Sequence, residues 1–176
     1  MSNNSTERLF FALWLNEDVR QALTKLSQPV TQNIQGKIIP PENWHITLAF
    51  LGEVDIPTKQ CMQQVAASVQ GRCFNLSLDK LSYWSRTGIL WLGANQIPNT
   101  LQDLVTRLST DLQDCGYHPE TRPFKTHVTL MRRANKIKML PPITPIRWTV
   151  EDFCLVRSTL NSSGAHYEVI ERWLLT

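Results

Sequence analysis

The stretch NWHITLAF, residues 43–50, places a histidine and a hydroxyl group inside an otherwise apolar run. Side chains alternate between the two faces of a β-strand, so His45 and Thr47 share one face with Ala49. One such pair proves little, because a buried histidine with a local hydrogen-bond partner gives the same pattern. The pair becomes informative only where the chain repeats it.

A second stretch, KTHVTLMR at residues 125–132, repeats the pattern His–aliphatic–Thr–Leu. Here His127 and Thr129 share one face, and nearly half of the 176-residue chain separates this motif from the first. Two of the four histidines in the chain therefore occupy matching settings. A duplicated half-domain, with one histidine strand in each half, explains the repeat better than chance does.

The remaining hydrophobic pattern predicts strands and helices in mixture, without strict alternation of the two. Strands are expected over residues 8–15, 73–81, 88–93, 147–157 and 166–174. A first helix should open at Glu17 with Asn16 as its cap, and Pro29 should kink or shorten its end. Two further helices are expected over residues 57–70 and 98–115.

This mixture predicts an α+β fold of mostly antiparallel sheets, with helices covering the outer faces. Residues 1–176 should form a single bilobal domain, in which two pseudo-symmetric lobes present the His–x–Thr strands to a central groove. The apolar fraction of 42% and the six tryptophans suffice for a real core. A net charge of +3 suits a local phosphate site but does not demand nucleic acid.

The four cysteines are scattered as Cys61, Cys73, Cys115 and Cys154, with no C-x-x-C pair and no neighbouring histidine. In a chain without a visible secretion signal they predict reduced core thiols and a cytoplasmic location. The apolar run at residues 9–15 is too short to span a membrane, so we expect a buried strand there and no membrane partner.

The two motifs together suggest a chemistry. An unperturbed imidazole has a pKa near ~6.5, so of two facing rings one can be neutral and the other protonated at neutral pH. Threonine hydroxyls can donate hydrogen bonds to anionic oxygens. No Ser or Cys motif accompanies either histidine as a nucleophile. The pattern therefore predicts metal-free phosphodiester cleavage or transesterification, with a base on the attacking side and an acid on the leaving side.

A metal site is the competing interpretation, because histidine pairs also bind zinc. Glu42 and Glu53 are within sequence reach of His45, but strand alternation does not place them beside it. No carboxylate cluster offers a place for a divalent ion. We therefore expect neither a metal nor another cofactor.

The segments ENWHITLAFLGE (42–53) and RPFKTHVTLMR (122–132) resemble the two signature motifs of the 2H phosphoesterase superfamily. The segments RLFFALWL and GILWLG are similar to its bacterial branch, the RNA 2′,3′-cyclic phosphodiesterases, also called the 2′-5′ RNA ligase family. The resemblance runs over nearly the whole chain. It implies hydrolysis of RNA 2′,3′-cyclic phosphate ends to 2′-phosphates, and reversible 2′-5′ ligation when an RNA 5′-hydroxyl replaces water.

The resemblance also carries the catalytic residues onto His45, Thr47, His127 and Thr129 of this sequence. It implies that His45 is the acid that protonates the leaving 3′-oxygen. It further implies that His127 is the base that activates water. Sequence symmetry by itself does not distinguish these two roles.

Two cations near the second motif are candidate substrate-binding residues. Arg132 occupies the place of an arginine that helps the family bind phosphate, but strict alternation puts it opposite His127. It reaches the groove only if the strand ends or bulges there. Lys125 shares the face of His127 and departs from the family's usual residue. It is either a phosphate contact or a solvated charge.

The substrate is less well defined than the chemistry. Expected partners are RNA ends with a 2′,3′-cyclic phosphate or related nucleotides, bound by a monomer. Rival functions are a phosphodiesterase for a small cyclic phosphate or nucleotide, and a non-catalytic RNA-binding module. Binding alone does not need two titratable imidazoles, which disfavours the module. Candidates for stacking on a base, most of them expected in the core, are Phe11, Tyr83, Trp84, Trp91 and Phe124.

Overall fold

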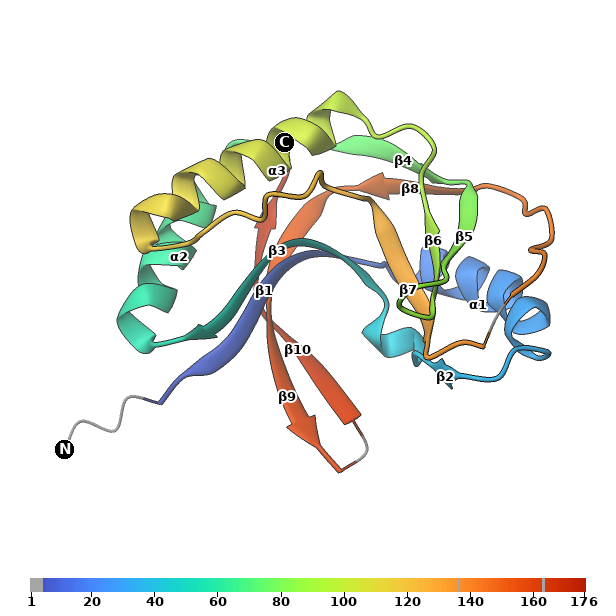
Figure 1. The fold of residues 1–176 in the computed structure, drawn as a ribbon. Helices are drawn as coiled ribbons and strands as arrows, with labels where there is room; N and C mark the ends of the chain where they lie inside the picture. The colour runs from blue at the N-terminus through green and yellow to red at the C-terminus, as the bar shows by residue number, and fades with distance from the viewer. Residues whose placement is uncertain (1–4, 136, 163) are drawn as a thin grey trace.

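The computed structural model describes residues 5–135, 137–162 and 164–176, and it has a strongly curved antiparallel sheet with helices on its convex side (Figure 1). The strands are β1 (Glu7–Trp14), β2 (Lys37–Ile38), β3 (His45–Val54), β4 (Phe74–Leu78), β5 (Lys80–Trp84), β6 (Ile89–Gly93), β7 (His127–Arg132), β8 (Ile146–Val150), β9 (Asp152–Asn161) and β10 (Gly164–Leu174). The α-helices are α1 (Glu17–Thr31), α2 (Ile56–Ser68) and α3 (Asn99–Asp111). The predicted α+β class is confirmed.

One sheet contains both histidine strands. Its order is β10-β9-β1-β3-β7-β6-β5, and β2 pairs with β7 beside this path. In the described part of the chain, strands β3 and β7 pair at one position, Ile46 with Val128, and then diverge (Figure 1). The two halves of the chain are therefore neighbours along one bent sheet. Strands β4 and β8 form a separate two-stranded sheet.

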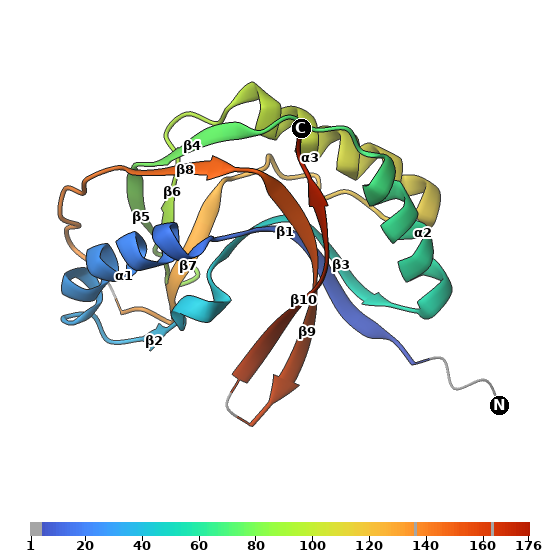
Figure 2. The same cartoon turned by 180° about the vertical axis from the view of Figure 1, so that it is seen from behind.

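The helices cover the outer faces, as the apolar patterns predict. Helices α2 and α3 pack together, and α3 lies on β3, while α1 lies against β8 (Figure 2). Asn16 caps α1 by accepting a hydrogen bond from the backbone N–H of Val19. The expectation for Pro29 is only partly met, because α1 continues past it to Thr31. The prolyl ring lies so near the helix end that few hydrogen bonds are lost.

Two predicted boundaries differ from the structure. The helix expected over residues 98–115 ends as α3 at Asp111 and continues as a 3-10 turn, Leu112–Cys115. Gly116, with φ of 83°, then reverses the chain in the left-handed region that glycine tolerates. The strand expected over residues 147–157 is two strands, because β8 pairs with β4 whereas β9 pairs with β1 and β10.

The expectation of four reduced core thiols is wrong. Cys61 in α2 and Cys115 after α3 form a disulfide, Cys73 is exposed, and only Cys154 is a buried free thiol. The sequence does not reveal this disulfide, because 54 positions separate the two cysteines. They meet only when α2 packs on the turn after α3. Burial raises the pKa of Cys154 to about 12, so that thiol stays protonated. No helix in the described part of the chain has the length and apolarity to cross a membrane.

Candidate active site

A β-bulge brings Arg132 to the same face as the second histidine. Along β7, Thr129 and Met131 pair with consecutive residues of β6, so Leu130 is an extra residue in the strand. Leu130 and Met131 are consequently both buried, and the alternation restarts one position later. The side chain of Arg132 therefore points to the same face as His127 and Thr129. Alternation alone would put Arg132 on the opposite face, and the bulge is what brings it to the groove.

Strand β3 contains an equivalent β-bulge. Thr47 and Ala49 pair with consecutive residues of β1, and Leu48 is the extra residue. Leu48 and Ala49 are both buried, as their counterparts on β7 are. The repeat seen in the sequence thus extends from residue type to backbone conformation.

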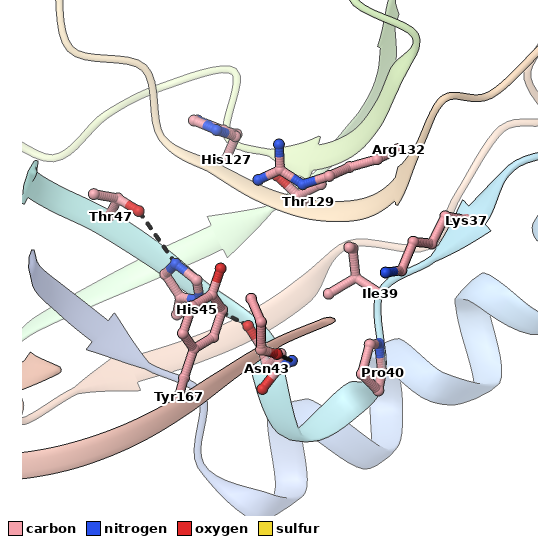
Figure 3. A pocket seen from close by; sticks show the side chains of 11 residues that line it. Lys37, Ile39, Pro40, Asn43, His45, Thr47, His127, Thr129, Arg132 and Tyr167 are labelled. Atoms are coloured by element: carbon pink, nitrogen blue, oxygen red, sulfur yellow. Dashed lines mark hydrogen bonds between the residues drawn. The ribbon is translucent and has the colours of Figure 1, made fainter. Parts of the chain in front are cut away.

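The bulged strands line a pocket of about 200 Å³ at the junction of the lobes (Figure 3). Five of the six residues proposed from the sequence lie on its wall: His45, Thr47, His127, Thr129 and Arg132. Lys125 is not among the described residues that line it. Its ammonium group lies 5.8 Å from the centre of the Trp84 ring, so the structure does not place this side chain as a wall of the pocket.

The imidazole of His45 is held in one orientation by two hydrogen bonds. Nδ1 lies 2.7 Å from the carbonyl oxygen of Asn43, which can only accept, so Nδ1 carries a proton in every state. Nε2 lies 3.2 Å from the hydroxyl oxygen of Thr47 and is the atom whose protonation changes. Trp14 stacks on the ring at 5.5 Å, and Tyr167 meets it edge-on at 5.3 Å.

The imidazole of His127 is held by one hydrogen bond, equivalent to the Nδ1 bond of His45. Its Nδ1 lies 2.8 Å from the carbonyl oxygen of Lys125, again the residue two positions before the histidine. Trp84 packs against this ring at 4.9 Å. Lys125 thus contributes its backbone to the site. Both rings therefore keep Nδ1 protonated and leave Nε2 to accept or donate a proton at the pocket.

Burial makes both rings hard to protonate. Desolvation lowers the pKa of His45 to about 4, and the positive charges of His127 and Arg132 act in the same direction. Desolvation also lowers the pKa of His127, assisted by Arg132 and Lys125. Without an anion both rings are therefore neutral at neutral pH, unlike the neutral–protonated pair that ordinary pKa values predict. A phosphate between them adds the opposite charge and raises both values.

Six lining residues have no place among the sequence-based candidates: Lys37, Ile39, Pro40, Asn43, Ala165 and Tyr167. Asn43 lies in a 3-10 turn, Pro41–Asn43, just before β3, so strand alternation does not indicate it. Its amide donates to the carbonyl oxygen of Ala165 at 3.1 Å, which holds β10 and Tyr167 against the first motif. No local pattern indicates Lys37 or the residues of β10, because only the strand order brings them here.

Burial removes most of the proposed stacking residues. Phe11 is fully buried and Trp91 is 6% exposed, so neither presents a ring face to a base. Tyr83 and Phe124 pack against the main core. Trp84 is partly exposed beside the imidazole of β7 and retains access.

The described residues offer little for a metal ion. They contain no group of three or more histidine, cysteine, aspartate or glutamate side chains arranged to bind one. The described lining holds two imidazoles, hydroxyls and two cations, with no carboxylate. The arrangement can transfer protons and bind an anion through the residues of the chain itself.

Comparisons with known proteins agree with this geometry. The family model described as "LigT like Phosphoesterase" matches twice, over residues 13–91 and 92–167, one match for each histidine motif. The RNA 2′,3′-cyclic phosphodiesterase of Escherichia coli (strain K12) is 31% identical over 172 residues, covering 97% of both chains. The enzyme of the same name from Thermus thermophilus is 31% identical, covering 96% of this chain and 90% of its own.

A solved structure has the same fold over the same length. The crystal structure of E. coli LigT complexed with 3′-AMP superposes with a TM-score of 0.90 at 31% identity. The superposition covers 97% of this chain and 99% of that one.

Proposed function

Because the chain belongs to the family of LigT-like phosphoesterases, we propose that it hydrolyses the 2′,3′-cyclic phosphate at the 3′ end of RNA to a 2′-phosphate. The observation that carries this proposal is the pair of imidazoles, one from each half of the chain, whose Nε2 atoms serve one pocket. The hydroxyls and guanidinium around them suit the oxygens of a phosphate.

In the proposed reaction His127 is the base. Its neutral Nε2 takes a proton from water while the water oxygen attacks phosphorus. The bond between phosphorus and the 3′-oxygen breaks as His45 donates its Nε2 proton to that oxygen. The phosphate stays on the 2′-oxygen. Proton exchange with solvent then returns both imidazoles to their starting states.

The acid role of His45 requires its ring to be protonated when substrate is bound. Its pKa is lowered by desolvation, and the negative charge of the phosphate acts in the opposite direction, so protonation is proposed to accompany substrate binding. Protonation also turns Nε2 from an acceptor into a donor, which releases the hydroxyl of Thr47 to donate to a non-bridging oxygen. Thr129 and Arg132 supply the matching contacts from the other strand.

The decisive experiment is product analysis. An oligoribonucleotide ending in 2′,3′-cyclic phosphate is incubated with the enzyme in EDTA, and the terminal phosphate is assigned by ³¹P NMR. We expect the 2′-phosphate and undiminished turnover. A 3′-phosphate product would overturn the roles of the leaving and retained oxygens. Turnover that requires added metal would overturn the metal-free mechanism. The same site should run in reverse with an RNA 5′-hydroxyl and form a 2′-5′ linkage.

The whole chain is proposed to act as one bilobal, monomeric domain. Strand β9 of the second half pairs with β1 of the first, so the halves interlock. Both imidazoles of the described pocket wall are supplied by the two halves of the same chain, so a two-histidine site needs no second copy; sedimentation at micromolar concentration tests the proposed monomer.

The proposed compartment is the cytoplasm, where RNA ends are available. The Cys61–Cys115 disulfide opposes that location, because cytosolic thiols are usually kept reduced. Alkylation of thiols in intact cells shows whether Cys61 and Cys115 are free or bonded, and so tests the proposed compartment. Free thiols at these two positions would support the cytoplasm, and an intact disulfide would contradict it.

A further inference from the structure

Lys37 is a second cation at the pocket. The reacting phosphate does not require it, because Arg132 and the hydroxyls can meet the charge of that group. Strand β2 pairs with β7 so that Lys37 lies directly opposite Arg132. Both side chains line the pocket, and Figure 3 shows them pointing into it from the side away from Thr47. The two positive charges therefore converge on one end of the site.

When no anion is bound, the opposed Lys37 and Arg132 lower the stability of the folded protein. Like charges directly opposite one another in an antiparallel pair repel. Within the described part of the chain, neither Lys37 nor Arg132 forms an ion pair, and no carboxylate lines the pocket. Two unneutralised cations at the edge of a cavity indicate a site built for negative charge.

The two cations have different positions relative to the imidazoles. Arg132 follows the bulge on the strand that carries His127 and Thr129, so it belongs with the reacting phosphate. Lys37 comes from β2, and its ammonium group lies near the start of β10, where a Cβ on Gly164 would approach it to 2.9 Å. Lys37 thus lies on the side of the pocket formed by β2 and the start of β10, on a different strand from the imidazoles and threonines.

A 2′,3′-cyclic phosphate carries one negative charge, which Arg132 and the hydroxyls can meet. An RNA chain adds another charge, the phosphodiester on the 5′ side of its terminal nucleotide, and a cyclic mononucleotide lacks it. Resting on the proposed function, we propose that Lys37 binds this adjoining phosphodiester and so makes the enzyme selective for RNA chains over cyclic mononucleotides.

The test compares two substrates, a dinucleotide ending in 2′,3′-cyclic phosphate and the corresponding 2′,3′-cyclic mononucleotide. Lys37→Gln should lower kcat/KM for the dinucleotide by roughly ten- to a hundredfold, as expected for a lost contact to a charged group. It should leave kcat/KM for the mononucleotide unchanged. The salt dependence of kcat/KM for the dinucleotide should also weaken, because one charge–charge contact is lost.

Two further variants are the controls. Lys37→Arg keeps the charge and should retain the preference for the dinucleotide. Lys25→Gln makes the same chemical change on the exposed face of α1 and should leave kcat/KM unchanged for both substrates. The melting temperature of Lys37→Gln should equal or exceed that of the wild type, since a repulsive pair is removed.

The outcomes separate this inference from the proposed function. Equal losses on both substrates would place Lys37 at the reacting phosphate, and no loss on either would make it a solvated surface charge; each result overturns the inference alone. A wild-type enzyme that hydrolyses neither substrate would overturn the proposed function itself.

Discussion

Ile46 and Val128, the middle residues of the two His–x–Thr motifs, pair with each other across antiparallel strands β3 and β7. A local twofold axis therefore passes between them, and each histidine lies on the side of the other strand's threonine. Both middle side chains are fully buried on the opposite face. This buried pair sets the register of the imidazoles, since a one-residue slip would turn every side chain of one strand to the other face.

Shortening Ile46 should therefore damage both folding and catalysis. We expect Ile46→Ala to lower the free energy of unfolding by about 2–5 kcal/mol, and Ile46→Val by about 0.5–1.5 kcal/mol. Denaturant titration measures both. Because the pair also sets the register, Ile46→Ala should reduce kcat even where the protein is fully folded, whereas Ile46→Val should not. Unchanged kcat in folded Ile46→Ala would contradict a positioning role for the pair.

Removing either imidazole should abolish most turnover, because general acid–base assistance contributes roughly 10²–10⁴-fold per group. The two variants differ in how a substrate with a good leaving group affects them. Such a substrate needs no acid, so a nitrophenyl phosphodiester should restore much of the rate of His45→Ala and little of that of His127→Ala. Rescue of His127→Ala instead would reverse the assignment of acid and base.

The threonines serve as the comparison for these variants. Thr47→Val and Thr129→Val keep the branched shape but lose one neutral donor each. We expect losses of kcat/KM no greater than about tenfold, since a neutral hydrogen bond contributes only about 0.5–1.5 kcal/mol. Steady-state kinetics on the same substrate measures the difference. A threonine loss equal to that of a histidine would mean that the hydroxyl takes part in proton transfer.

The desolvated, half-buried imidazole of His45 should also make folding sensitive to acid. Its pKa is about 4 in the folded protein and near 6.5 when the ring is solvated. Between these values the unfolded state binds more protons, so the free energy of unfolding falls as the pH is lowered from 6.5 toward 4. Urea titrations at pH 7.5 and pH 4.5 should show a smaller decrease for His45→Gln, which has no group titrating in this range. Equal decreases in both proteins would argue against a depressed pKa.

Reduction of the Cys61–Cys115 disulfide should weaken the fold without changing the chemistry. The bond closes a long loop between α2 and the turn after α3, so its loss should cost about 2–4 kcal/mol of unfolding free energy. Denaturant titration with and without dithiothreitol measures this cost, and Cys61→Ser should reproduce it. Neither cysteine lines the pocket, so kcat should persist in the folded, reduced protein. A parallel loss of kcat would instead connect the bond to the strand of His127.

The sequence by itself determined the repeat, the chemistry and most of the elements. His45, Thr47, His127 and Thr129 could be assigned to one face because strand alternation is a local property of the backbone. The same local rules predicted the cap at Asn16 and the amphipathic helix that the structure shows as α3. Each of these features depends on residues only a few positions apart.

The tertiary structure decided what depends on distant segments. It placed Arg132 in the pocket, because the bulge that reorients it is fixed by the pairing of β7 with β6. It brought Lys37 and Tyr167 to the site and joined Cys61 to Cys115, all through contacts between elements far apart in the chain. It also lowered the pKa of both imidazoles, since desolvation depends on everything packed around a ring and on no local pattern of residues.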